Sequence, residues 1–422
     1  MWAVLQRFGC PRRFVDLIQA LHDGMTGQVC QQNKISDEFP ITHGLKQGCV
    51  LAPTLFALYL AAMLYKSPTN IPGVDVRYRF DGGLFNLARF RSKKLTQVTK
   101  ITNMLYADDA ASPTLTPVEL QQTVNCYKNA CERFGLTINV QKTKVLAQPS
   151  PGTSLPHFNI SISDTPLEQV DHFSYLGSLL SVHGNCGQDV EKRIGAAHAA
   201  FGRLSHRVFL NKDLTVKTKL MVYQAVVIST LLYGCETWTL YRHDFRKLER
   251  FHQQKLRSIL RIKWEDHITN LDVLEKALAN SIESSIIGHQ LRWIGHVQRM
   301  DDTRLPRQVL YGELTSGTRP HGGPKRRYKD QFKQNMKLTG LNPQTWDQLA
   351  KDRSTWRQTI PAAVKMFEEE RRRIVKAKRQ ARKLRAAQPR PPPTVLCDLC
   401  GRLFHARIGL FSHRKHAHRP QP

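Results

Sequence analysis

Acidic side chains are scarce in this chain of 422 residues, where 34 Asp and Glu stand against 63 Lys and Arg. The resulting formal charge of +29 favours RNA or DNA as a partner, because contacts with phosphates release their counterions. A basic surface without a specific partner, as in a ribosome-like protein, has the same composition. The charge therefore predicts an affinity for polyanions and does not name one.

Long apolar runs are also missing, since none reaches the roughly 18 residues that a membrane-spanning helix needs. The two longest candidates, residues 51–65 and 220–234, are interrupted by Pro53 and Gln224. The amino terminus, MWAVLQRFGCPRR, lacks the basic-then-apolar pattern of a secretory signal. We therefore expect no membrane partner and a location in the nucleus or the cytoplasm.

A disulfide framework is not expected, because the nine cysteines are an odd number at irregular spacing. Two of them belong to a different pattern, Cys397-x2-Cys400-x12-His413-x4-His418, which is the spacing of a two-Cys two-His zinc site. His416 is a rival fourth ligand, but two intervening residues reach the ion less well than four. The spacing predicts a zinc finger at the end of the chain.

The predicted finger has apolar and basic residues where a nucleic-acid-binding finger needs them. Phe404 and Leu410 occupy its two core positions. The positions that read bases in such fingers are Ala406, Gly409 and Ser412, whose side chains are short, so we expect weak sequence preference. A protein-binding finger with a solvated basic face is the alternative. The side chains suited to phosphates are Arg402, Arg407, Arg414, Lys415 and Arg419.

The first 66 residues predict helices on either side of one extended stretch. The stretch covers residues 29–41, and residues 54–65 are predicted helical. Pro11 suits the first turn of an earlier helix. The apolar face predicted for that helix consists of Phe14, Leu17, Ile18 and Leu21.

The middle of the chain changes from mixed to helical periodicity. Residues 67–98 are Gly-rich, basic and predicted irregular, residues 101–106 and 173–180 have strand character, and residues 117–134 predict a helix. From residue 189 to residue 300 the pattern is helical. The two clearest apolar faces there are Ile194, Ala197, Phe201 and Leu204, and Phe245, Leu248, Phe251 and Leu256.

The remaining residues before the finger are basic. Residues 312–330, GELTSGTRPHGGPKRRYKD, predict a connector and lack the GK[ST] ending of a phosphate-binding loop. Residues 368–385 predict a strongly basic helix, and residues 389–393 a stiff Pro-rich linker. Helix and finger together would form a nucleic-acid tether.

Two adjacent carboxylates follow an apolar strand in Tyr106-Ala107-Asp108-Asp109. Carboxylate oxygens bind hard divalent cations, and nucleotidyl transfer by two metal ions needs such a cluster. An Asp-Asp pair in a turn is more often only solvated surface, so the dipeptide alone predicts little.

The segments around this pair are more informative than the pair itself. They are GLKQGCVLAPTLFALY (44–59), FGLTINVQKTKVL (134–146) and HFSYLGSLLS (172–181), followed by LLYGCETWTL (231–240) and GHVQRMDDTRLPRQVLYGEL (295–314). In this order and spacing they resemble the later palm motifs, and the region after the palm, of reverse transcriptases from non-LTR retrotransposons. The resemblance extends to about residue 360.

The resemblance implies roles for individual residues. Asp108 and Asp109 match the metal-binding carboxylates, for magnesium, and Lys142 matches a lysine near the leaving phosphates. The residues that match nucleic-acid contacts are Gln47 and Gly48, under template and nucleotide, and Tyr175 and Gly177, in the hairpin that grips the primer. As alternatives, Gln47-Gly48 could cap a helix, Lys142 could be a solvated loop charge, and Tyr175-Leu176 could be sheet core.

Two departures from the family pattern bear on activity. The family's first metal-binding aspartate lies before a segment like WAVLQRFGCP, with which this sequence begins, so that aspartate and the nucleotide-binding fingers are expected to be absent. Asp16 is a superficial match that follows this segment, and its helical surroundings predict a surface residue. Ser112-Pro113 stands where the family has apolar strand residues, and proline should shorten the returning strand.

The expected fold class is α+β. The predicted parts are a reverse transcriptase palm remnant (1–185), a helical thumb-like domain (186–310), a basic connector and helix (311–393) and a ββα zinc finger (394–422). The resemblance implies a truncated RNA-directed DNA polymerase that binds RNA and DNA and is inactive alone. Alternatives are a non-enzymatic nucleic-acid-binding protein, or activity restored by a longer element-encoded chain.

Overall fold

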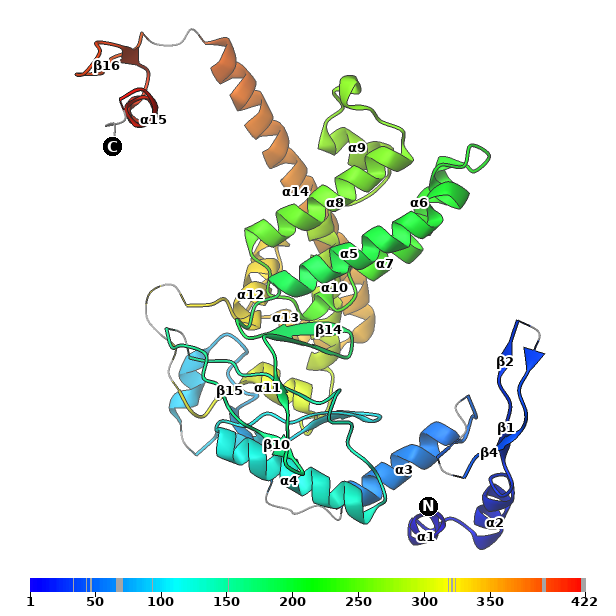
Figure 1. The fold of residues 1–422 in the computed structure, drawn as a ribbon. Coiled ribbons are helices and arrows are strands. Elements are labelled where there is room, and N and C mark those ends of the chain that lie inside the picture. Colours follow the sequence, from blue (N-terminus) through cyan, green and yellow to red (C-terminus); the bar gives the residue numbers. More distant parts are fainter. Residues whose placement is uncertain are drawn as a thin grey trace.

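The computed structural model describes most of the chain, and the α+β class is confirmed (Figure 1). Its description leaves out Asn33, His43, Lys46, Gln47, residues 66–70, Lys93, Pro151, Thr318, Pro320, His321, Gly323, residues 389–391 and residues 419–422. Within the described part, no helix is both long enough and apolar enough to cross a membrane.

The amino-terminal segment projects from the rest of the molecule, to which α3 connects it (Figure 1). Helices α1 (Trp2–Arg7), α2 (Arg12–Ala20) and α3 (Ala52–Tyr65) enclose a small core. The apolar face predicted for α2 is wrong in part: Val15 and Ile18 are buried, whereas Phe14, Leu17 and Leu21 are exposed. The reason is that only one side of α2 packs on α1 within the described residues, so the remaining apolar residues stay largely in solvent. Asp16 lies on the exposed side, as predicted.

The stretch predicted as extended folds back on itself. Strands β1 (Thr26–Gly27) and β4 (Phe39–Pro40) pair, as do β2 (Cys30–Gln31) and β3 (Lys34–Ile35), which makes a projecting hairpin. Gln32 reverses the chain with φ +48°.

A three-stranded antiparallel sheet joins two distant parts of the chain. Its order is β15 (Gly312–Leu314), β5 (Val74–Tyr78) and β6 (Gln97–Ile101). The prediction of irregular structure is therefore wrong for β5, which is stabilised by a strand more than two hundred residues away. A Cβ at Gly312 would lie 2.4 Å from Val76 Cγ1, so the close approach of β15 to β5 requires glycine there.

The predicted palm region otherwise consists of a long helix and separate pairs of short strands. Helix α4 (Pro117–Arg133) is confirmed and begins in a capping box between Thr116 and Glu119. It covers a small core of Val145, Ile160, Ile162 and Leu167. The strand pairs are β7 (Met104–Tyr106) with β8 (Asp109–Ala111), β9 (Lys144–Val145) with β12 (Glu168–Gln169), β10 (Ser161–Ile162) with β11 (Thr165–Pro166), and β13 (His172–Tyr175) with β14 (Ser178–Ser181).

The helical region predicted from residue 189 is confirmed, and its largest core lies between its helices. Both predicted apolar faces contribute, with Phe201, Leu248 and Phe251 fully enclosed. The helices are α5 (Gly187–Leu204), α6 (Val216–Val222), α7 (Ser229–Leu231), α8 (Arg242–Ile259), α9 (Asn270–Lys276) and α10 (Ile282–Gln298).

A second core lies between α10 and the helices that follow it. Helices α11 (Leu305–Tyr311), α12 (Tyr328–Leu338), α13 (Trp346–Lys351) and α14 (Arg353–Ala387) bury Phe332, Trp346 and Trp356 against α10. Much of the predicted connector and basic helix is thus a packed part of the fold. The second half of α14 leaves this core and leads to the finger, formed by β16 (Val395–Leu396), β17 (Leu403–Phe404) and α15 (Arg407–Ala417) (Figure 1).

Candidate nucleic-acid and metal sites

Asp108 and Asp109 lie at the tip of the β7–β8 hairpin. Tyr106 pairs with Asp109 across a two-residue turn, in which Ala107 has φ +50°. β8 ends at Ala111, so the strand is short where Pro113 follows, as predicted. Among the described strands, β7 and β8 pair only with each other, and Tyr106 is 66% exposed. The carboxylates are therefore open to solvent on a weakly supported turn.

The β13–β14 hairpin contacts this turn. The Tyr175 hydroxyl donates a hydrogen bond of 2.9 Å to the carbonyl oxygen of Met104. Partial burial, and then the negative charge of Asp109, raise the pKa of Tyr175 above its usual value. The structure thus brings together two segments that the sequence matched to the catalytic turn and to the primer-gripping hairpin.

The other predicted palm residues do not join this site. Lys142 is exposed in a turn closed by a 3.1 Å hydrogen bond from its backbone N–H to Asn139 Oδ1. In the described part of the chain, no hydrogen bond or ion pair connects its side chain to Asp108 or Asp109. Gly48 has φ +87°, a conformation that favours glycine, and open space around it. Gln47 lies outside the described residues.

A third metal ligand is not found beside the aspartates. Among the described residues, no group of three or more His, Cys, Asp or Glu ligand atoms within 4.8 Å of one another includes Asp108 or Asp109. The pair alone offers four carboxylate oxygens at an exposed turn.

The residues that hold the β13–β14 hairpin in place were not predicted from the sequence. Asp189 is buried at the start of α5, where Oδ1 accepts from the Leu179 N–H (3.0 Å) and Oδ2 from Trp238 Nε1 (2.7 Å). At the turn, Arg193 donates to the carbonyl oxygen of Gly177 and stacks on the ring of Tyr233. An acidic residue in the first turn of a helix is common, so nothing in the sequence distinguished Asp189.

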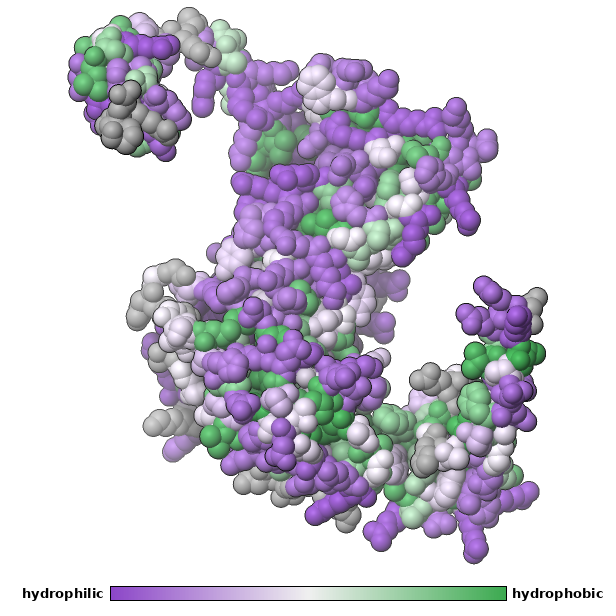
Figure 2. Space-filling view, in the orientation of Figure 1, coloured by the Kyte–Doolittle hydropathy of each residue, from purple (hydrophilic) through white to green (hydrophobic). Residues whose placement is uncertain are grey.

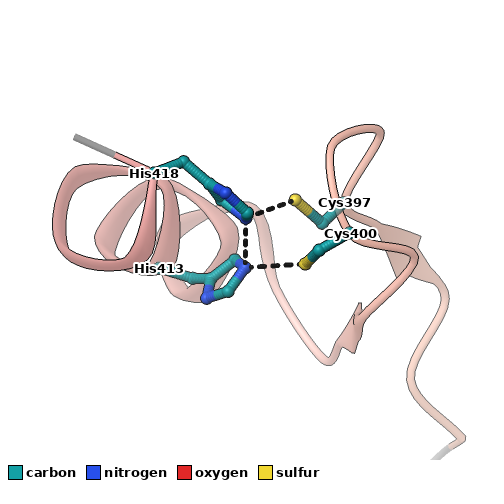
Figure 3. Close-up of side chains that lie close together, drawn as sticks. All are labelled: Cys397, Cys400, His413 and His418. Carbon is teal, nitrogen blue, oxygen red and sulfur yellow. Dashed lines mark hydrogen bonds between the residues drawn. The ribbon is translucent and has the colours of Figure 1, made fainter. Parts of the chain in front are cut away.

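The four predicted finger ligands converge (Figure 3). Cys400 Sγ lies 3.1 Å from His413 Nε2, Cys397 Sγ lies 3.7 Å from His418 Nε2, and the two Nε2 atoms are 3.1 Å apart. His416 is exposed and outside the cluster. This group could hold a metal ion.

The local electrostatics of the cluster suit a cation. Burial alone would raise the pKa of the Cys397 thiol, but the backbone N–H groups of Leu399 and Cys400 bring it below its ordinary value. Desolvation, and then the neighbouring charges of His418 and Arg402, lower the pKa of His413. Both shifts favour the deprotonated forms that bind metal ions.

The finger's predicted nucleic-acid-binding residues lie on its surface. Arg407 and Lys415 are exposed on α15, while Arg414 forms an ion pair with Asp398. Of the three predicted base-reading positions, Gly409 faces the finger's own core, because a Cβ there would lie 3.4 Å from the Phe404 ring.

A second group of potential ligands was not predicted. Cys235 and Glu236, just before Trp238, approach His289 on α10. Burial raises the pKa of Cys235 to about 12, which keeps the thiol protonated at neutral pH. We read Cys235 as a core residue, because it is fully buried in the largest hydrophobic cluster.

Comparison with known proteins gives consistent matches. Residues 1–180 match the family model described as reverse transcriptase (RNA-dependent DNA polymerase). A putative uncharacterised transposon-derived protein of Caenorhabditis elegans is 26% identical over 62% of this chain and 95% of its own length.

Two Drosophila melanogaster proteins also match. The RNA-directed DNA polymerase from mobile element jockey is 21% identical over 53% of this chain. The retrovirus-related Pol polyprotein from the type-2 retrotransposable element R2DM is 22% identical over 71% of it. The chain spans 22% and 26% of the lengths of these two relatives.

Proposed function

We propose that the chain binds nucleic acid and does not polymerise by itself. Its residues 1–180 belong to the reverse transcriptase family. The observation that carries the proposal is the isolated pair Asp108 and Asp109, which has no third ligand beside it among the described residues. We propose that it acts in the nucleus or the cytoplasm, where RNA and DNA are found.

The chemistry explains why two carboxylates are too few. Nucleotidyl transfer by two metal ions requires both ions at fixed positions, where they stabilise the attacking and leaving oxygens. Asp108 and Asp109 would hold magnesium, which supplies that charge stabilisation when bound. Positioning and charge stabilisation are nearly all of the catalysis, so an ion held on an exposed turn should give severely reduced activity.

The nucleic-acid contact is proposed to come from the basic second half of α14 together with the finger. Residues 374–388 are all exposed and include six Lys or Arg and no Asp or Glu. The six are Lys376, Lys378, Arg379, Arg382, Lys383 and Arg385. A projecting helix whose charges are all positive suits the phosphates of RNA and DNA.

The finger is proposed to hold zinc. A tetrahedral ion with Zn–S bonds of about 2.3 Å and Zn–N bonds of about 2.0 Å places its ligand atoms roughly 3.3–3.8 Å apart. The observed separations of 3.1 Å and 3.7 Å are close to that range. Cys397, Cys400, His413 and His418 would be the ligands, and the ion would close the finger. The Cys397→Ala variant should bind one zinc fewer than the wild type; an unchanged zinc content would contradict the assignment.

The polymerase proposal is tested by primer extension on a homopolymer template with magnesium or manganese. We expect no incorporation above background by the wild-type chain, and template binding that is the same in the wild type and in Asp108→Ala. Robust incorporation that Asp108→Ala abolishes would overturn the proposal. Addition of a longer element-encoded chain tests whether a missing carboxylate can be supplied by a partner.

A further inference from the structure

The outer face of α15 carries two large apolar side chains in solvent. Ile408 is 80% exposed and Phe411, one helical turn later, is 71% exposed. Figure 2 shows hydrophobic and hydrophilic residues side by side on the surface of the finger. Phe404 and Leu410 form the inner side, so Phe411 is not needed for the finger's core. Two large apolar side chains exposed together on one short helix form a small apolar patch, which singly exposed apolar residues do not.

The face expected to read bases in a duplex groove cannot serve that purpose. Gly409 lies against Phe404, whose ring is also 4.9 Å from that of His413. Ala406 and Ser412 have short side chains. The helix instead exposes Ile408 and Phe411, each one residue before a predicted base-reading position, Gly409 and Ser412.

Cations flank Phe411 on both sides. Arg407 and Lys415 are four residues before and four residues after it, so all three lie near one face of the helix. In the described part of the chain neither cation makes an ion pair, whereas Arg414 is paired with Asp398. Residues 392–418 contain four Lys or Arg and one Asp, so the surface around Phe411 is complementary to a polyanion.

We propose that Phe411 is a stacking platform for an unpaired base, with Arg407 and Lys415 contacting phosphates on either side of it. The inference rests on the proposed nucleic-acid binding and names single-stranded RNA or DNA as the ligand of the finger. A duplex hides the faces of its bases, whereas a single strand offers them to aromatic side chains. The eight helical rises from Arg407 to Lys415 span about 12 Å of helix, which leaves room for a nucleotide between the two cations.

The test measures the Kd of the full-length chain for a labelled single strand and for the duplex of the same sequence, across a range of salt concentrations. Phe411→Ala should weaken single-strand binding by about tenfold, the usual size of one base–aromatic stack, and duplex binding by less than about twofold. Phe411→Tyr should restore single-strand binding. Trp264→Ala removes an aromatic side chain that is 86% exposed outside the finger and serves as the matched control.

The salt dependence separates stacking from charge. Phe411→Ala should leave the slope of log Kd against log salt unchanged, whereas the Arg407→Ala, Lys415→Ala double variant, which removes two phosphate contacts, should reduce it by about 1.4 for a single strand. Cys397→Ala should unfold the finger, so its loss of affinity for nucleic acid is the largest that removing finger contacts can cause.

Several outcomes overturn the inference. Equal losses for single strand and duplex, no loss with Phe411→Ala, or no loss with Cys397→Ala each contradict it. A change of oligomeric state in Phe411→Ala with unchanged binding would make this face a protein contact instead. If the wild-type chain binds neither nucleic acid, the proposed function fails as well; failure of Phe411→Ala alone leaves that function standing.

Discussion

The hairpin that carries Asp108 and Asp109 and the helix α14 differ in how the fold supports them. Strands β7 and β8 form a two-stranded sheet that no other described strand extends, and Tyr106 is 66% exposed. Trp356 of α14 is 2% exposed and donates a 2.9 Å hydrogen bond to the carbonyl oxygen of Leu291. The segment that carries the catalytic motif is thus weakly packed, whereas the region without a catalytic motif contains the larger cores.

This contrast separates the residues that identify a protein from those that stabilise it. In the sheet β15–β5–β6, a distant strand supports a segment of the predicted palm, because β15 pairs with the edge of β5. In the part of the chain that the structure describes, no such strand covers β7–β8. Chemistry at the aspartates would therefore need support that this hairpin lacks, whereas the nucleic-acid binding proposed for the second half of α14 would not.

The largest expected effect is at the centre of the second core. Trp356→Ala should lower the free energy of unfolding by about 3–5 kcal/mol, because it leaves a cavity and removes the hydrogen bond from the indole to the carbonyl oxygen of Leu291. Urea unfolding followed by circular dichroism measures this. The exposed control Trp264→Ala should change stability by less than about 0.5 kcal/mol. Equal effects of the two variants would remove the contrast between core and surface.

A smaller effect is expected where α14 meets the start of α10. Glu368 is buried, accepts a 2.7 Å hydrogen bond from Ser281 Oγ, and pairs with Arg371 and Arg372. Burial opposes its ionisation, but these partners lower the pKa of Glu368 to about 2. Glu368→Gln should cost about 2 kcal/mol at pH 7.

The pH dependence of that effect follows from the sign of the shift. A carboxyl group whose pKa is depressed in the folded state stabilises it above the unfolded pKa, and this contribution is lost as the pH falls through the folded value. The difference between wild type and Glu368→Gln should therefore be constant above about pH 5 and shrink between about pH 4.5 and pH 2. A difference that does not depend on pH would contradict the ionised state of Glu368.

A substitution where the β13–β14 hairpin meets α5 should lower the free energy of unfolding by about 1 kcal/mol. Asp189→Asn directs an amide NH2 at either the Leu179 N–H or the Trp238 indole, so one hydrogen bond is lost. Hydrogen exchange at Leu179 should become faster. Glu191→Gln breaks only an exposed ion pair with Lys247 and should leave that exchange rate unchanged.

The smallest effect is expected at the aspartate hairpin itself. Tyr106→Ala should change the free energy of unfolding by less than about 0.5 kcal/mol, because its ring is mostly in solvent. A loss above about 2 kcal/mol in the same unfolding experiment would show that the hairpin is packed, and would weaken the argument that the aspartates lack support.

Local patterns predicted their elements well, and patterns completed by distant residues did not. Helix α4 is confirmed because its apolar spacing and its Thr116–Glu119 cap lie within a few residues. Strand β5 was missed because β15, its partner on one side, begins at residue 312. The face of α2 was misassigned because contact with α1 selects Val15 and Ile18 among several apolar residues. The roles of Lys142 and Gly48 stay predictions of the family resemblance.

By itself the sequence determined the excess of positive charge, the spacing of the four finger ligands and the position of Asp108-Asp109 after a strand, since each depends on residue types and on neighbours within one or two turns. The tertiary structure alone decided that Tyr175 meets the aspartate hairpin, that Asp189 anchors β14, and that Gly409 faces inward while Phe411 faces solvent. These facts depend on which distant surfaces exclude water from one another, and burial of that kind has no signature in the local sequence.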